Sequence, residues 1–251
     1  MRTEPKTQDP RSEHPPELLK IDQDYLVRWG QREVVRAVAF GAGASAAILA
    51  AALWWNPFCL LGLIILLPPV ALLILFFRNP KRVVPDGQGL VVSPADGTIT
   101  DLTQVVEDEF LKGPAIRVGI FLSIFSVHVN RAPVSGRVEW VCHREGAHHD
   151  ARRPECAIEN ESNLIGMLRD DVRGPEGARI LVRQVSGAIA RRIVCPLEPG
   201  VFVARGGLVG MIKYGSRTEL FLPAGPDLRI CVKPGDKVSG GSTIIAQLSG
   251  A

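Results

Sequence analysis

Two long apolar stretches lie in the first third of the chain, and short alternating stretches fill most of the rest. The first runs from Val34 to Trp55 with one charged residue, Arg36, and the second runs from Phe58 to Phe77 without any. Each is about 20 residues long, which is the length that a helix needs to cross the hydrocarbon layer of a membrane. Asn56-Pro57 is a natural turn between them. The pattern therefore predicts an α-helical membrane hairpin over residues 34–77.

Charges around the hairpin predict its orientation. The alternative of a buried helical pair in a soluble domain is disfavoured, because such helices normally keep a polar stripe. Basic residues flank both stretches, and these are Arg28, Arg32, Arg36, Arg78, Lys81 and Arg82. Because positive flanks stay in the cytoplasm, we expect a hairpin in the cell (inner) membrane, with the following domain facing the cytoplasm. Pro68-Pro69 predicts a kink in the second helix, or a hairpin that enters the bilayer without fully crossing it.

Residues outside the hairpin fall into two expected regions. Residues 1–33 are polar and proline-rich at the start, and we expect a polar tail and an amphipathic lead-in. Residues 78–251 carry short apolar stretches between turn residues, which are typical of strands. Within them, 197–206 and 232–241 share a Pro-Gly turn, a short strand and a second glycine turn. The expected fold is a mostly β (α+β) domain with lipoyl/biotinyl-like β-sandwich hairpins, a likeness of architecture that carries no function.

Composition excludes some classes of partner. The chain is 46% hydrophobic and 22% charged with a net charge of +3, so we expect a globular protein and no nucleic-acid partner. Five cysteines without a CxxC pair favour a reducing compartment. A zinc site is conceivable from the cysteines and histidines between Cys142 and Cys156, but their spacing matches no standard site, and we expect no metal.

Three short segments carry the candidate chemistry. Gly215-Ser216 stands in a predicted turn between two strands, where the serine hydroxyl could attack the preceding carbonyl, although a plain β-turn is the common fate of this pair. Asp96 lies in the turn Ser-Pro-Ala-Asp-Gly, and His128 is expected at the end of an apolar strand. Together these side chains would supply a nucleophile, a base and an orienting acid.

Taken in this order behind a membrane hairpin, the segments closely resemble phosphatidylserine decarboxylases of the short bacterial and archaeal branch. Ser-Pro-Ala-Asp-Gly (93–97) and Met-Ile-Lys-Tyr-Gly-Ser-Arg-Thr-Glu-Leu-Phe-Leu-Pro (211–223) carry the resemblance, which runs from Phe76 to the carboxy terminus. It implies a proenzyme that cuts itself between Gly215 and Ser216 and converts Ser216 into a covalent pyruvoyl cofactor. His128 would be the base, oriented by Asp96. The pyruvoyl ketone would form a Schiff base with phosphatidylserine, releasing carbon dioxide and phosphatidylethanolamine.

At two positions the chain departs from the pattern of the family that it resembles. Glu159-Asn160-Glu161-Ser162-Asn163 is similar to a family segment that usually has arginine in place of Ser162. We assign substrate binding to Glu159, Asn160 and Asn163. Some longer relatives have a second histidine where this chain has Arg131, so both acid–base tasks fall to His128. The two chains from one proenzyme are expected partners of each other, and a homodimer of such pairs is a further expectation.

Two alternative functions stay open at the sequence level. The first is an archaetidylserine decarboxylase, which would use the same residues on a different lipid backbone. The second is a membrane-tethered adaptor or carrier built on the lipoyl-like hairpins. A carrier would need a lysine at a hairpin tip, and Lys213 leads straight into Tyr214-Gly215-Ser216, a context that suits cleavage better. Denaturing electrophoresis separates the adaptor from the enzyme, because an adaptor should run as one intact chain.

Overall fold

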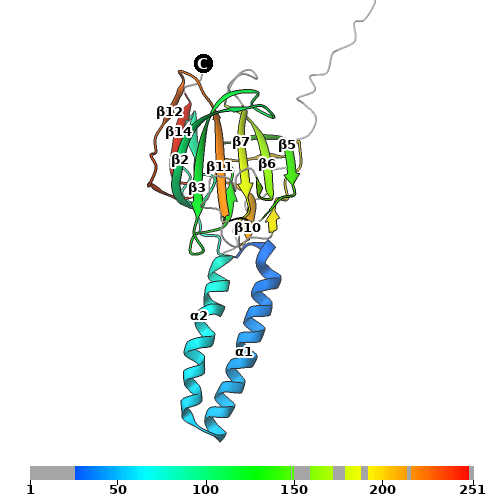
Figure 1. Cartoon of the computed structure of the whole chain (residues 1–251), viewed down its shortest axis with the longest axis vertical. Helices are drawn as coiled ribbons and strands as arrows, with labels where there is room; N and C mark the ends of the chain where they lie inside the picture. Colours follow the sequence, from blue (N-terminus) through cyan, green and yellow to red (C-terminus); the bar gives the residue numbers. More distant parts are fainter. Residues whose placement is uncertain are drawn as a thin grey trace, which may run out of the picture.

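The computed structural model describes residues 26–147, 149, 159–171, 179–187, 192–213 and 216–248. The predicted polar tail up to residue 25 lies outside these residues. A helical hairpin and a β body make up the described part, and the hairpin projects from one end of the body (Figure 1). The expected fold class, mostly β behind an α-helical hairpin, is confirmed.

The hairpin consists of two long helices, each preceded by a short 3-10 turn. In chain order these are η1 (Arg28–Gly30), α1 (Gln31–Trp54), η2 (Pro57–Leu60) and α2 (Leu61–Phe76). Asn56 stabilises the connection, because its Oδ1 accepts a hydrogen bond from the Phe58 amide at 2.9 Å. Pro68 and Pro69 lie inside α2 without ending it.

Small residues let α1 and α2 approach each other. A Cβ atom placed on Gly41 of α1 would lie 3.3 Å from the Val70 side chain of α2, and one placed on Gly62 would lie 3.3 Å from Ile48. The remaining surface of the hairpin is apolar and open, with Trp54 and Trp55 at its tip 88% and 90% exposed. A core helix pair of a soluble domain would be mostly buried, so the exposed apolar surface fits membrane association instead.

The β body is built mainly on one antiparallel sheet of eight strands. Its order is β13 (Lys237–Val238), β2 (Gly97–Glu107), β3 (Gly113–Leu122), β11 (Ser216–Pro223), β7 (Arg179–Val185), β6 (Ser162–Arg169), β5 (Gly136–Arg144) and β9 (Phe202–Val203).

Two small antiparallel sheets complete the described body. One has the order β4 (Val129–Arg131), β10 (Leu208–Lys213) and β8 (Arg192–Val194). The other has the order β1 (Leu90–Val92), β14 (Ile244–Leu248) and β12 (Leu228–Ile230). The main hydrophobic core includes fully buried residues of the large sheet, such as Ile120, Met167, Val182 and Leu220, together with Ile245 of β14.

The two segments with a repeated turn pattern form similar structures. Each has its Pro-Gly glycine in the left-handed region, Gly200 with φ 97° and Gly235 with φ 94°. Each also ends in a second left-handed glycine, Gly206 with φ 79° and Gly241 with φ 76°. These last two glycines touch, since a Cβ atom on Gly241 would lie 3.3 Å from the Gly206 Cα atom. The glycines are required because other residues rarely adopt this backbone conformation.

Arg131 joins the hairpin to the body. Its guanidinium donates to the Gly206 carbonyl at 2.8 Å and to Asn79 Oδ1 at 2.5 Å, just beyond the end of α2. Burial, with the nearby charge of Arg82, lowers the pKa of Arg131 to about 10, which leaves it cationic at neutral pH. The residue that stands in place of a second histidine therefore holds the base of the hairpin against the β body.

Candidate active site

The chain crosses from one sheet to another at the predicted cleavage point. Strand β10 of the β4–β10–β8 sheet ends at Lys213, and strand β11 of the large sheet begins at Ser216. Gly215, the other half of the predicted cleavage pair, lies outside the described residues, as does Tyr214. The predicted cleavage pair thus lies at a connection between sheets, with described strands on both sides.

Ser216 is buried, and its hydroxyl is unsatisfied. Its backbone pairs with Leu122 at the end of β3, and its side chain is fully inaccessible to solvent. Within the described part of the chain, no group forms a hydrogen bond with its Oγ. A buried polar group without a partner costs about 1–3 kcal/mol, so it calls for an explanation. A nucleophile aimed at a neighbouring carbonyl is one such explanation.

The residues after Ser216 alternate between two environments, as successive residues of a strand do. Thr218 points to the same side as Ser216, and its Oγ1 accepts a hydrogen bond from Asn130 Nδ2 at 3.0 Å. Arg217 and Glu219 point to the other side. Arg217 Nε donates to Glu219 Oε1 at 2.9 Å, and its Nη2 donates to Asp101 Oδ2 at 2.6 Å. Glu219 also binds Arg183. The motif Ser-Arg-Thr-Glu thus encodes a reactive face and an ion-paired face.

His128 follows a turn instead of ending a strand, which corrects the sequence-based expectation. Strand β3 stops at Leu122, and His128 stands one residue before β4. The His128 carbonyl accepts from the Ile212 amide at 3.2 Å, which places its backbone beside the strand that leads to Ser216. Asn130 and His128 lie two residues apart on an extended segment, as Thr218 and Ser216 do. The Asn130–Thr218 bond therefore shows that the side of β4 with Asn130 faces the side of β11 with Thr218.

The imidazole of His128 is held neutral. Its Nδ1 lies 2.9 Å from the Ser126 carbonyl, so Nδ1–H is the donor and the lone pair is on Nε2. The Phe76 ring lies over it, with 4.1 Å between the ring centroids. Burial, together with the positive charge of Arg78, lowers the pKa of His128 to about 4, against the opposing effect of the Ser126 carbonyl. At neutral pH the ring is therefore an uncharged base.

Asp96 has other partners than His128 in this structure. Its Oδ2 accepts from Arg82 at 2.6 Å, and its Oδ1 accepts from the Gly240 amide at 2.7 Å. The described contacts of the imidazole that fix its orientation are with Ser126 and Phe76. The structure thus places the backbone of His128 beside β10, the strand that leads to Ser216, and it places Asp96 in an ion pair with the segment that follows the hairpin.

A chain of buried amides runs beside the site, and Asn163 is its one member among the residues predicted from the sequence. Asn163 Nδ2 donates to Gln184 Oε1 at 3.0 Å, and Gln184 Nε2 donates to Asn130 Oδ1 at 2.8 Å. Asn130 in turn donates to Thr218. The chain connects β6, β7, β4 and β11. The alternation Val-His-Val-Asn was a signal for Asn130, because it puts that side chain on the same side as His128.

The other two predicted substrate residues, Glu159 and Asn160, lie just before β6, at the end of the large sheet where β11 begins. Asn160 binds Ser186, which follows Val185, and Val185 pairs with Arg217. Asn160 is buried, and its amide binds the backbone of His149 and the carbonyl of Ser186. Glu159 is exposed and lies 3.3 Å from His149 Nε2. Cys142 and His143 are on β5, whereas His148 and Cys156 lie outside the described residues. Among the residues that the structure describes, no three potential metal ligands gather.

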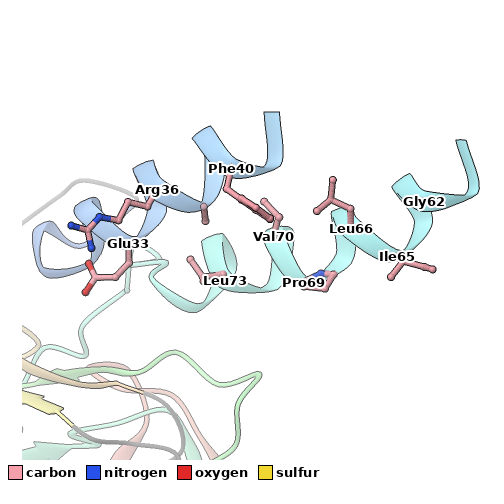
Figure 2. A pocket seen from close by; sticks show the side chains of 10 residues that line it. Glu33, Arg36, Phe40, Gly62, Ile65, Leu66, Pro69, Val70 and Leu73 are labelled. Atoms are coloured by element: carbon pink, nitrogen blue, oxygen red, sulfur yellow. The ribbon is translucent and has the colours of Figure 1, made fainter. Parts of the chain in front are cut away.

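A groove of about 780 Å³ lies between α1 and α2. Figure 2 shows its apolar side chains along both helices, among them Phe40, Leu66 and Val70, with Glu33 and Arg36 at the end nearest the β body. Glu33, which lines this end of the groove, also accepts a hydrogen bond from Lys213 Nζ at 2.5 Å. The groove therefore adjoins the strand that leads to Ser216.

Comparisons with known proteins identify relatives over most of the chain. A family model described as phosphatidylserine decarboxylase matches residues 70–246. Proteins named phosphatidylserine decarboxylase proenzyme are similar to this chain in several bacteria. The one from Carboxydothermus hydrogenoformans is 45% identical over 70% of this chain and 80% of its own length. The one from Rhodopirellula baltica is 43% identical over 80% of each. The one from Nitrosomonas europaea is 36% identical over 84% of this chain and 90% of its own length.

Proposed function

Because the chain belongs to the phosphatidylserine decarboxylase family, we propose that it cuts itself between Gly215 and Ser216 and then decarboxylates phosphatidylserine to phosphatidylethanolamine. The single observation that carries the self-cleavage is the Ser216 hydroxyl, which is fully buried and has no hydrogen-bond partner among the described residues. The relatives are named as proenzymes, which agrees with a processed chain.

The cleavage step uses only groups of this chain. Ser216 Oγ attacks the Gly215 carbonyl carbon and gives its proton to His128. His128 passes this proton to the Ser216 nitrogen as the C–N bond breaks, and the amide becomes an ester. Loss of the proton on the Ser216 Cα then breaks the Cβ–Oγ bond, which leaves a carboxylate on Gly215 and a dehydroalanine at position 216. Water replaces the nitrogen as ammonia, and a pyruvoyl group results. His128 suits the first step because it is neutral at physiological pH.

The surroundings of Ser216 fit a pyruvoyl group. The site is shielded from water by the large sheet, and Thr218 and Asn130 supply polar atoms on the same side. Once formed, the ketone supplies an electrophile for the substrate amine and an electron sink while carbon dioxide leaves. A protonated base must then return a proton to the substrate carbon, and we assign this to His128.

In this proposal Asp96 supports the site through its contacts with Arg82 and the Gly240 amide. Its carboxylate neutralises Arg82 on the segment that connects the hairpin to β1, and it fixes the Gly240 turn. Substrate binding by Glu159, Asn160 and Asn163 stays a prediction. Asn163 is connected to Asn130 through Gln184, whereas Glu159 is the one of the three that is open to solvent.

The membrane position follows from the hairpin and its charges. Two spans, Arg28–Trp54 and Pro57–Phe76, are long and apolar enough to cross a bilayer. Both basic flanks lie at the end where the hairpin meets the β body (Figure 1). Since such flanks stay in the cytoplasm, we place the β body on the cytoplasmic face of the cell membrane.

Intact mass spectrometry of the purified protein tests the proposal. Wild-type protein should give two chains, residues 1–215 and 216–251, with the second lacking a free amino terminus. Ser216→Ala should give one full-length chain and no decarboxylation, because no hydroxyl remains to attack. Ser242→Ala, which alters a partly exposed serine of the turn before β14, is the matched control and should process normally. An active preparation that contains only full-length wild-type chain would refute self-cleavage.

A further inference from the structure

The base of the hairpin packs on the two strands that flank the active site. A hydrophobic cluster combines Val27, Val34, Phe76 and Phe77 of the hairpin region with Val127, Val129, Leu208 and Met211 of the β body. The β-body members belong to β4 and β10 or directly precede them. These are the strands that follow His128 and lead to residue 213. The hairpin is therefore part of the wall of the catalytic site.

Lys213 makes a short polar contact between the β body and the hairpin. It is the last described residue before Ser216, and only 6% of it is exposed. Its Nζ binds Glu33 Oε1 of α1 at 2.5 Å and the Trp29 carbonyl of η1 at 3.0 Å. The Phe77 ring lies beneath the same ammonium, 5.6 Å from its centroid. Each of these partners belongs to the hairpin or its ends.

A buried ammonium with three such partners has little freedom, so the backbone of residue 213 is fixed relative to α1. From there to Ser216 the chain extends at most about 10 Å. Attack of Oγ on the Gly215 carbonyl needs the two atoms about 3–3.5 Å apart, and a misplacement of about 1 Å can slow such a step 100-fold. The end of β10 must therefore be held firmly for cleavage to occur.

We propose that Glu33, acting through Lys213, positions the chain segment that is cut, so that the proenzyme matures only when its membrane hairpin is docked on the β body. Glu33 is a positioning residue, because it touches neither the scissile bond nor the substrate. The arrangement prevents a reactive ketone from forming on a body that is detached from its anchor. This proposal rests on the self-cleavage proposed above.

A double-mutant cycle on the full-length protein tests the coupling. The variants are Glu33→Gln, Lys213→Met and the two combined, and the measurement is the rate at which full-length chain converts to two chains in detergent. We expect each single variant to slow conversion at least tenfold. The double variant should be slowed by a similar factor rather than by the product, because it removes both charges of one pair. Arg32→Gln, one residue from Glu33 and exposed, should convert at the wild-type rate.

Hydroxylamine separates a defect in the attack from a defect in the later elimination, and circular dichroism controls for a loss of stability. Hydroxylamine cuts any ester at residue 215, so a variant that still forms the ester is cleaved at the wild-type rate when hydroxylamine is present. If Glu33 positions the attack, Glu33→Gln stays slow with hydroxylamine, at temperatures where circular dichroism shows it folded. Rescue by hydroxylamine, or multiplicative effects in the cycle, would overturn the proposal. A wild-type chain that never converts would instead refute the proposed function.

Discussion

At the scale of single residues, the environment of His128 sets the pH range in which it can act as a base. The ring is buried under Phe76 and donates to the Ser126 carbonyl, and its pKa falls to about 4 from an ordinary value near 6.5. A histidine in water would be half protonated near pH 6.5 and would lose its function as a base there. In this protein the neutral form persists well below that pH.

The pH dependence of self-cleavage follows from this shift. The rate should be flat from pH 8 to about pH 5.5 and should fall only as the pH approaches about 4. Between about pH 6.5 and 4 the unfolded chain binds a proton on His128 that the folded chain does not, so stability should decrease as the pH falls through this window. Conversion rates across the pH range measure the first effect. A rate that halves near pH 6.5 would contradict it.

Substitution of Asn130 should affect both the stability of the β body and the rate of self-cleavage. Asn130→Ala removes the bond to Thr218 and leaves Gln184 without its acceptor. We expect a loss of about 1–3 kcal/mol in the free energy of unfolding, together with slower self-cleavage. Glu107→Gln is the control. Its carboxylate is also buried and caps the amides of residues 109–111, but it touches none of the site residues. Slow cleavage in both variants would point to stability alone.

At the scale of elements, strand β11 carries two functions on its two faces. One face has Ser216 and Thr218, and the other has Arg217 and Glu219 in an ion-paired network. The network joins β11 to its neighbour β7 through Arg183, and β3 contributes Arg117. Because this network fixes β11 to the strands on both sides, it also fixes the position of Ser216 at the start of β11.

Glu219→Gln tests the network. Removing one partner of a buried ion pair costs about 3–5 kcal/mol, since the arginines keep their charges. We expect this loss in denaturant unfolding of the uncut Ser216→Ala background. Glu139→Gln is the matched control, because Glu139 and its partner Arg179 are both partly exposed, and such a pair contributes about 0–1 kcal/mol. Equal stability of the two variants would contradict the assigned role.

At the scale of the whole molecule, the turn before His128 lies beside the base of the hairpin, where α2 ends. Arg78, just past α2, donates to the Phe125 carbonyl at 2.6 Å. The side chains of Phe125 and Ile124 are 67% and 41% exposed. Exposed aromatic rings favour the lipid–water interface, so this turn should rest in the headgroup layer at the entrance to the site.

The double variant Ile124→Asn, Phe125→Asn should turn over long-chain phosphatidylserine in vesicles several-fold more slowly, because the turn would no longer enter the lipid–water interface. Self-cleavage and turnover of a water-soluble short-chain substrate should be unchanged. Val106→Asn changes an equally exposed residue of β2 and should have no effect on either. A parallel loss with both substrates would show that the turn matters for folding rather than for the membrane.

The sequence by itself determined the parts that depend on neighbours along the chain. The length and apolar character of residues 34–77 were enough for the hairpin, and the glycine turns of 197–206 and 232–241 were readable because left-handed backbone favours glycine. The motif around Ser216 carried the resemblance to the family that the comparisons support. Local spacing was sufficient in each case.

Only the tertiary structure decided which side chains meet. The Lys213–Glu33 pair spans 180 positions, and the Asn130–Thr218 bond spans 88. Asp96 lies against Arg82 across 14 positions, and the Gly240 amide binds the same carboxylate across 144 positions. Such pairings depend on strand order and register, and these are fixed by how the whole body buries its apolar surface, not by any stretch of chain alone.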